Sequence, residues 1–161
     1  MSLRLVRIDD RLIHGQVVAV WLRALGAHRI VIVDDATARD DFLRDVLILA
    51  APPDVPVEVY GVDESIARLL ELAADAAAVI VLARIPRTVL QLRRAGIPIE
   101  KVDLGGMGAG PGRKRIYKTI SLSAAEVGEL RELEELGTRV EIQIVADDRP
   151  IPFRSLDKEP G

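Results

Sequence analysis

The sequence predicts an α/β fold, with a single doubly wound, mostly parallel sheet and helices on both faces. Two observations lead to this prediction. Short apolar segments alternate along the chain with segments whose apolar residues recur at helical spacing. Several of the apolar segments are continuous runs of Val, Ile and Leu, which are typical of strands covered on both faces. We therefore expect one domain over residues 1–161, with a short polar tail from about residue 150.

Strands are expected at residues 3–8, 29–33, 55–60, 78–83 and 99–104, then at 115–122 and 140–145. The first helix is marked by a stripe that ends at Gly26 and contains Val17, Val18, Trp21, Leu22 and Leu25. A second stripe, stopped by Pro52 and Pro53, contains Phe42, Leu43, Val46, Leu47 and Ala50. A third runs from Ile66 to Ala73.

Pro86 suits the first turn of a fourth helix, because its missing N–H has no helical partner there. Ser123 and Glu126 form a capping box that begins a fifth helix, which Gly137 closes. Between the last two helices, residues 105–112 are expected to form a glycine-rich loop. This loop lacks the spacing of a phosphate-binding loop, and a strand rather than a helix follows it.

Composition excludes several classes of function. The absence of cysteine rules out disulfides, thiolate catalysis and cysteine-ligated metals. With 22 basic and 25 acidic residues, the net charge of −3 does not favour nucleic-acid binding, and we interpret Arg113, Lys114 and Arg115 as a solvated cluster. No apolar run approaches the roughly 20 residues that span a bilayer, and no secretory signal is evident, so a cytoplasmic location is expected.

The carboxyl ends of parallel strands meet at one edge of a sheet, where ligands bind in open α/β folds. The residues expected there are Asp9, Asp10, Arg11, His14, Asp34, Asp35, Arg84, Gly105, Gly106 and Met107. His28, the other of the two histidines, is expected on the surface at the opposite edge.

His14 is the candidate nucleophile at this edge. Neutral imidazole is nucleophilic near pH 7, and a phosphoryl group placed on it would find the guanidinium of Arg11 and the amides of the helix that begins near Gly15. The alternative is a hydrogen-bonded loop histidine without a catalytic role.

The aspartate pairs 9–10 and 34–35 are open to more than one interpretation. They could hold Mg²⁺, as in receiver domains, or cap helices, and one of the first pair could orient Arg11 or the imidazole through a hydrogen bond.

The run Arg7-Ile-Asp-Asp-Arg-Leu-Ile-His14-Gly-Gln-Val17 resembles the active-site motif of IIB components in the mannose/fructose/sorbose family of the bacterial sugar phosphotransferase system. Further similar segments follow in order over about residues 3 to 150: 30–35, 50–53, 96–98, 105–107, 136–137 and 140–142.

This resemblance implies a phosphohistidine–sugar phosphotransferase. His14 would accept a phosphoryl group from a phosphorylated IIA protein, on the imidazole nitrogen nearer the backbone, and Arg11 would contact the phosphoryl oxygens. The group would pass to a sugar at the membrane components IIC and IID, with the protein at the inner face of the membrane and no metal or organic cofactor. The supporting residues would be Asp10, Gly15, Gln16, Asp34, Arg84, Gly105 and Gly106.

The sequence departs from the family pattern at Asp103, where Asn is common before Gly-Gly-Met, and in residues 108–115, where family members carry polar and Lys-containing residues. Two other functions stay open: a regulatory or interaction domain without onward transfer to sugar, and a receiver-like Mg²⁺-dependent domain phosphorylated on aspartate. A homo-oligomer is also open, because apolar helix faces serve either as core or as interface.

Overall fold

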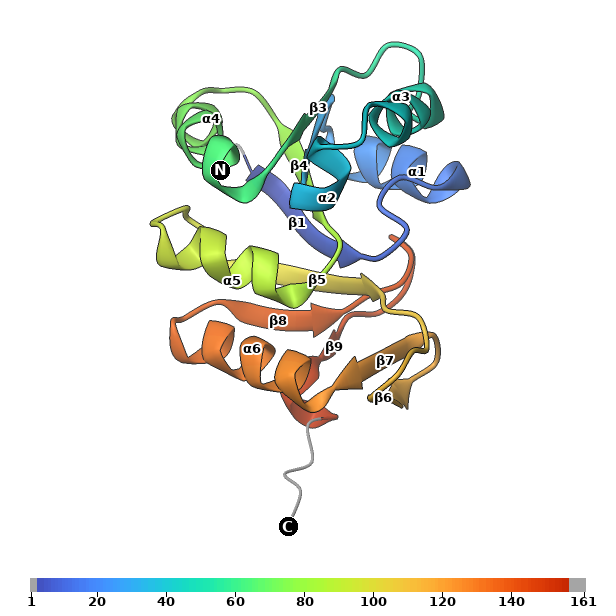
Figure 1. Cartoon of the computed structure of the whole chain (residues 1–161), viewed down its shortest axis with the longest axis vertical. Helices are drawn as coiled ribbons and strands as arrows, with labels where there is room; N and C mark the ends of the chain where they lie inside the picture. Colours follow the sequence, from blue (N-terminus) through green and yellow to red (C-terminus); the bar gives the residue numbers. More distant parts are fainter. Residues whose placement is uncertain (1–2, 157–161) are drawn as a thin grey trace.

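Seven strands form the main sheet in a computed structural model that describes residues 3–156 (Figure 1). From one edge to the other they are β3 (Val57–Tyr60), β2 (Arg29–Val33), β4 (Val79–Ala83), β1 (Leu3–Asp9), β5 (Lys101–Gly106), β8 (Arg139–Ile142) and β9 (Ile151–Pro152). Every neighbouring pair is parallel except β8 and β9. The predicted mostly parallel α/β sheet is confirmed.

Helices cover both faces of this sheet, which confirms the doubly wound arrangement. The helices α1 (Gly15–Leu25) and α3 (Asp41–Ala50) contribute to one buried cluster, while α4 (Val62–Ala74), α5 (Pro86–Arg94) and α6 (Ala124–Glu135) contribute to the other. Successive side chains of a strand point to opposite faces, so Leu5 of β1 joins the first cluster and Val6 the second. Ser123 and Glu126 form the predicted capping box at the start of α6.

The expected strand over residues 115–122 is wrong, because this segment is an antiparallel hairpin of β6 (Arg113–Tyr117) and β7 (Ile120–Ser123). The chain reverses at Lys118, whose φ of 39° lies in the left-handed region. No glycine, proline or asparagine marks the turn, and apolar residues flank it on both sides, so the sequence resembles one continuous strand.

Other boundaries also differ. Gly105 and Gly106 are the last residues of β5 rather than the first residues of a loop, and β8 ends at Ile142 instead of residue 145. A short helix α2 (Asp35–Ala38) was not expected. The segment after residue 150 begins with β9 and a 3-10 helix η1 (Phe153–Ser155), in which Phe153 is buried, so its start is not simply polar. Residues 157–161 of the expected tail lie outside the described residues.

Most of the second apolar stripe is not buried, although it lies on the expected helix. Of its members only Leu47 is buried, in a cluster that includes Val59 of the edge strand β3, whereas Phe42 is 78% exposed and Leu43 is half-buried. Leu49, on the same helix, is 83% exposed. At the edge of a sheet one side of a helix suffices to cover the strand, so the remaining apolar residues of α3 face solvent.

Candidate functional site

The topology brings the candidate residues to one edge of the sheet. Strands β1, β2, β4 and β5 are parallel, so the residues that follow them lie at a common carboxyl edge. From β1 the chain enters α1 on one face, whereas from β5 it passes through the β6–β7 hairpin to α6 on the other face (Figure 1). The neighbouring ends of β1 and β5 therefore form a switch point, the usual place for a ligand in such sheets.

A tight turn leads from β1 to His14. The amide of Leu12 donates to the carbonyl oxygen of Asp9 at 2.9 Å, and Leu12 has a φ of 57°. A left-handed conformation costs a non-glycine residue about 1–2 kcal/mol. Burial of the Leu12 and Ile13 side chains in the cluster around Trp21 offsets this cost and anchors the turn.

His14 stands at the N-cap position of α1. Its side chain makes no capping hydrogen bond, and the first turn of α1 contains no acidic residue. The exposed Gly15 and Gln16 begin this helix. The amides of the first turn are therefore open to an anion, and the partial positive charge of the helix end favours one.

Three effects lower the pKa of His14 below its ordinary value of 6.5. Burial is the largest, and the positive charges of Arg11 and then Arg7 add to it, while Asp9 acts in the opposite direction. The imidazole is therefore neutral at pH 7, which is the form that attacks an electrophile. Its Nδ1 atom is buried and has no hydrogen-bond partner among the described residues, so it reaches a reactant only if the ring turns.

The carboxylate of Asp9 holds Arg11. Oδ1 accepts from the backbone amide of Arg11 at 3.0 Å and from its Nε at 3.1 Å, and Oδ2 accepts from NH2 at 3.2 Å. Asp9 is only 1% exposed, whereas the side chain of Arg11 is 46% exposed. The guanidinium is thus fixed on one side and open to solvent on the other.

Asp10 and the two glycines tie this turn to the end of β5. The Asp10 carboxylate accepts from the amide of Gly108 at 2.7 Å, and the Asp10 amide donates to the carbonyl of Gly106 at 3.0 Å. Gly105 and Gly106 are both buried beside this turn. The structure therefore brings Asp10, Gly105 and Gly106 to the His14 turn, where the sequence predicted support for the site.

The second aspartate pair acts as helix caps. Asp34 accepts from the amide of Thr37 at 3.1 Å and from its hydroxyl at 2.6 Å, and Arg84 lies 3.6 Å from the same carboxylate. Asp35 accepts from the amide of Val62 at 2.8 Å, at the start of α4. Within residues 3–156 no group of three or more His, Cys, Asp or Glu side chains is arranged to hold a metal ion. The capping interpretation of Asp34 and Asp35 is the one that the contacts support.

Sequence reasoning missed two buried charged residues behind the site. Arg7 is 2% exposed and Asp103 is 1% exposed, and they form an ion pair between the adjacent strands β1 and β5. Burial raises the pKa of Asp103 to about 7 against the opposing effect of Arg7. The available signal was Arg7 between Val6 and Ile8 in a segment expected to form a strand covered on both faces, since a buried charge requires a partner.

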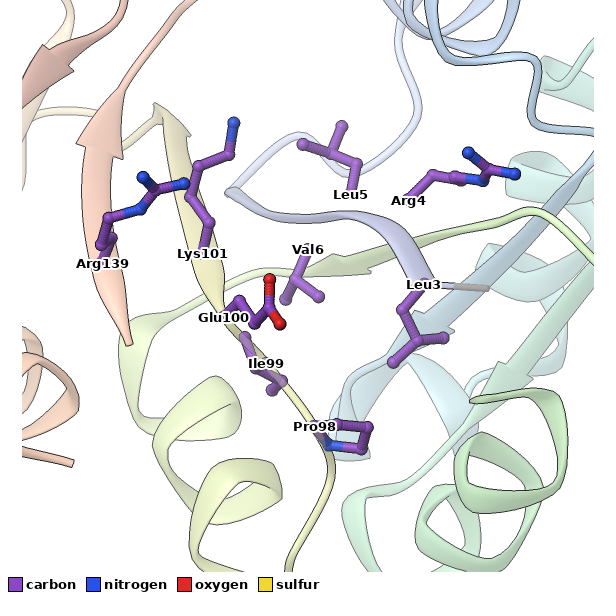
Figure 2. Close-up of a pocket in the computed structure, with 9 residues that line it drawn as sticks. All are labelled: Leu3, Arg4, Leu5, Val6, Pro98, Ile99, Glu100, Lys101 and Arg139. Carbon is purple, nitrogen blue, oxygen red and sulfur yellow. The ribbon is translucent and has the colours of Figure 1, made fainter. Parts of the chain in front are cut away.

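The pocket in Figure 2 lies at the other edge of the sheet. It lies between the amino-terminal halves of β1 and β5. Leu3, Val6 and Ile99 contribute apolar side chains to its lining, and Pro98 and Lys101 also line it. It is therefore separate from the His14 turn. The exposed position of His28 confirms its assignment to the surface. No helix within residues 3–156 has the length and apolar character needed to cross a membrane.

Comparison with known proteins identifies relatives over the whole chain. Residues 3–159 match the family described as the sorbose subfamily IIB component of the phosphotransferase system. The sorbose-specific EIIB component of Lacticaseibacillus casei is 39% identical over 148 residues, which cover 92% of this chain and 90% of that protein. The mannose-specific EIIAB component of Escherichia coli K12 is 30% identical over 97% of this chain. That protein is longer, and the matched region covers 48% of it.

A solved structure shares the fold in detail. The crystal structure of the IIBSor domain of the sorbose permease from Klebsiella pneumoniae superposes with a TM-score of 0.93 and 35% sequence identity. The alignment covers 100% of this chain and 99% of that domain. The similarity therefore extends over every element described above.

Proposed function

The chain belongs to the sorbose subfamily of IIB components of the sugar phosphotransferase system, and from this premise we propose that His14 carries the phosphoryl group. It accepts the group from a phosphorylated IIA protein and delivers it to a sugar held by the membrane components IIC and IID. The observation that supports this most directly is an imidazole at an uncapped helix N-terminus, beside a fixed guanidinium.

In the first step the phosphoryl group passes from the imidazole of a IIA histidine to the imidazole of His14. The lone pair of a His14 ring nitrogen attacks the phosphorus, the bond from phosphorus to the IIA histidine breaks, and the donor nitrogen keeps the electron pair. If Nε2 of His14 and the free ring nitrogen of the donor phosphohistidine each carry a proton, Nδ1 attacks, both rings keep their protons, and the donor leaves as a neutral imidazole. Because Nδ1 is buried, this route requires the imidazole to turn about its side-chain bonds.

Charge develops on the oxygens of the transferring group, and catalysis of such steps is mainly positioning and electrostatic stabilisation. Arg11 supplies a guanidinium that is open to solvent on one side, and the first turn of α1 supplies free amides. In the second step a sugar hydroxyl attacks the phosphorus, its proton passes to solvent, and His14 recovers its lone pair. Gln16 and Arg84 lie near this edge as candidates for contacts with partners.

The name of one relative supports a IIA protein as the partner. The Escherichia coli protein carries A and B components in one polypeptide, as its designation EIIAB states. We therefore propose phosphorylated IIA as the donor here, and a cytoplasmic location at the inner face of the membrane through IIC and IID. No cofactor takes part in either step.

The test is transfer of labelled phosphate from phospho-IIA. We expect an acid-labile, base-stable phosphate on the protein, lost in His14→Ala and kept in His28→Ala, which removes the exposed histidine as a matched control. Circular dichroism checks that both variants fold. Normal labelling of His14→Ala, or a base-labile acyl phosphate on an aspartate, would contradict the proposal.

Onward transfer is tested separately with membrane vesicles that contain IIC and IID. Phosphorylated sugar is the expected product. Labelled protein that binds the vesicles without forming sugar phosphate would instead support a regulatory role.

A further inference from the structure

We propose that Asp9, anchored by the buried Arg7, is the positioning residue that sets the orientation of Arg11 toward a phosphoryl group on His14. This inference rests on the proposed function of His14. It assigns a role to Asp9 and Arg7, which lie behind the residues that would touch the phosphoryl group.

Arg7 is held at fixed points around its guanidinium. NH1 donates to Asp103 and, at 2.8 Å, to the carbonyl of Gln143, while NH2 donates to the carbonyl of Ile144 at 2.7 Å. The Trp21 ring lies 5.5 Å from its central carbon, at a distance where a cation–π contact is favourable. The second bond of NH2 goes to Oδ2 of Asp9 at 3.2 Å. Arg7 therefore forms a rigid base for the Asp9 carboxylate.

Asp9 is shared between two guanidinium groups. Arg7 contacts it from the interior, and Arg11 contacts it from the solvent side through Nε and NH2. These contacts leave NH1 of Arg11 without a partner within residues 3–156. A half-exposed arginine loses considerable rotamer freedom when it is held in one orientation, and Asp9 arranges this before a phosphoryl group arrives.

The two glycines of β5 provide the space for this chain of contacts. A Cβ on Gly105 would lie 2.0 Å from Cζ of Arg7, and a Cβ on Gly106 would lie 2.7 Å from Oδ1 of Asp9. The same Cβ on Gly106 would lie 3.1 Å from NH2 of Arg11. Any side chain at these positions would displace the guanidinium and carboxylate groups.

Asp9→Asn tests the role of Asp9, because the amide keeps the shape but places N–H donors against the donors of the two arginines. In transfer from phospho-IIA we expect kcat to fall by about 10²-fold, as for other misplaced catalytic groups, with KM nearly unchanged. Glu58→Gln is the matched control, because Glu58 also lies between two arginines, Arg29 and Arg68, but on the edge strand β3. Its kcat should equal that of the wild type.

A double-mutant cycle separates positioning from general support of the fold. If Asp9 acts through Arg11, Asp9→Asn should cause little further loss in an Arg11→Ala background. Equal fold-losses in both backgrounds, or transfer by Asp9→Asn within twofold of the wild type, would overturn the proposal.

NMR of the unmodified protein gives a test that needs neither a variant nor transfer. The Nε–H of Arg11 should show slow exchange with water because Asp9 accepts from it, and exchange as fast as in a free arginine would overturn the proposal. If the wild type acquires no phosphate, the proposed function fails, while this measurement still decides whether Asp9 holds Arg11.

Discussion

The guanidinium of Arg7 occupies the space in which a side chain on Gly105 would stand, since an added Cβ would lie 2.0 Å from its Cζ atom. Arg7 cannot withdraw without breaking buried hydrogen bonds to Asp103 and to two backbone carbonyls. Gly105→Ala should therefore lower the free energy of unfolding by about 1–3 kcal/mol, measured by urea denaturation.

Gly128 offers the opposite case. It lies in the middle of α6 with no atom within 4 Å of an added Cβ, so Gly128→Ala should stabilise the protein by about 0.5–1 kcal/mol. A Gly105→Ala variant as stable as the wild type would show that the buried arginine can move.

Arg11→Ala should raise the pKa of His14. Burial is the larger cause of the lowered pKa and remains in the variant, so we expect a partial return toward 6.5 as the effect of the Arg11 charge disappears. A lowered pKa keeps the imidazole neutral down to a lower pH, so loss of phosphoryl acceptance on acidification should begin at higher pH in the variant. NMR titration of the His14 ring measures the shift. Arg11→Lys keeps a charge there and should show a smaller change.

Asp103→Asn should change how stability depends on pH. Burial raises the pKa of Asp103 to about 7 in the folded protein, so between about pH 4 and 7 the folded state binds the proton that the unfolded state releases. Stability in this window therefore falls as pH rises, by up to about 1.4 kcal/mol per pH unit. Urea denaturation from pH 5 to 8 should show this decline in the wild type and a flatter profile in Asp103→Asn. Equal slopes would contradict it.

The sequence predicted the sheet and the His14 turn because both depend on local pattern: continuous apolar runs, glycine and proline stops, and polar residues after strands. It did not predict the contact between Arg7 and Asp103, which are 96 residues apart and meet only because β1 and β5 pair. For the same reason Gly105 and Gly106 were expected in a loop. Their place within β5 depends on the buried guanidinium and carboxylate beside them, which no local pattern shows.

Local sequence pattern also does not show which apolar residues of α3 are buried. This helix offers a matched pair of variants. Leu47 is 5% exposed and Leu49 is 83% exposed, on the same helix and with the same side chain. Leu47→Ala should cost about 2–5 kcal/mol of unfolding free energy, whereas Leu49→Ala should stay within about 0.5 kcal/mol. Urea denaturation of both variants checks this. A large loss for Leu49→Ala would mean that this face is covered in solution, and a change in sedimentation would identify the cover as a second copy.

Glu58→Gln should lower the stability of the fold at neutral pH and make that stability depend less on acid. Hydrogen bonds from Arg68, then from Tyr60 and Arg29, lower the pKa of Glu58 from 4.5 to about 2 against the effect of burial. A lowered pKa stabilises the folded state at every pH above about 4.5, and this contribution disappears as pH falls from about 4.5 to about 2. At pH 7 we expect Glu58→Gln to cost about 1–3 kcal/mol, less than the full shift implies, because solvent reaches part of this cluster. Urea denaturation at pH 7, 4 and 3 should show the two proteins converging as the pH falls. A difference that stays constant down to pH 3 would mean that Glu58 stabilises the edge strand by packing and not by charge.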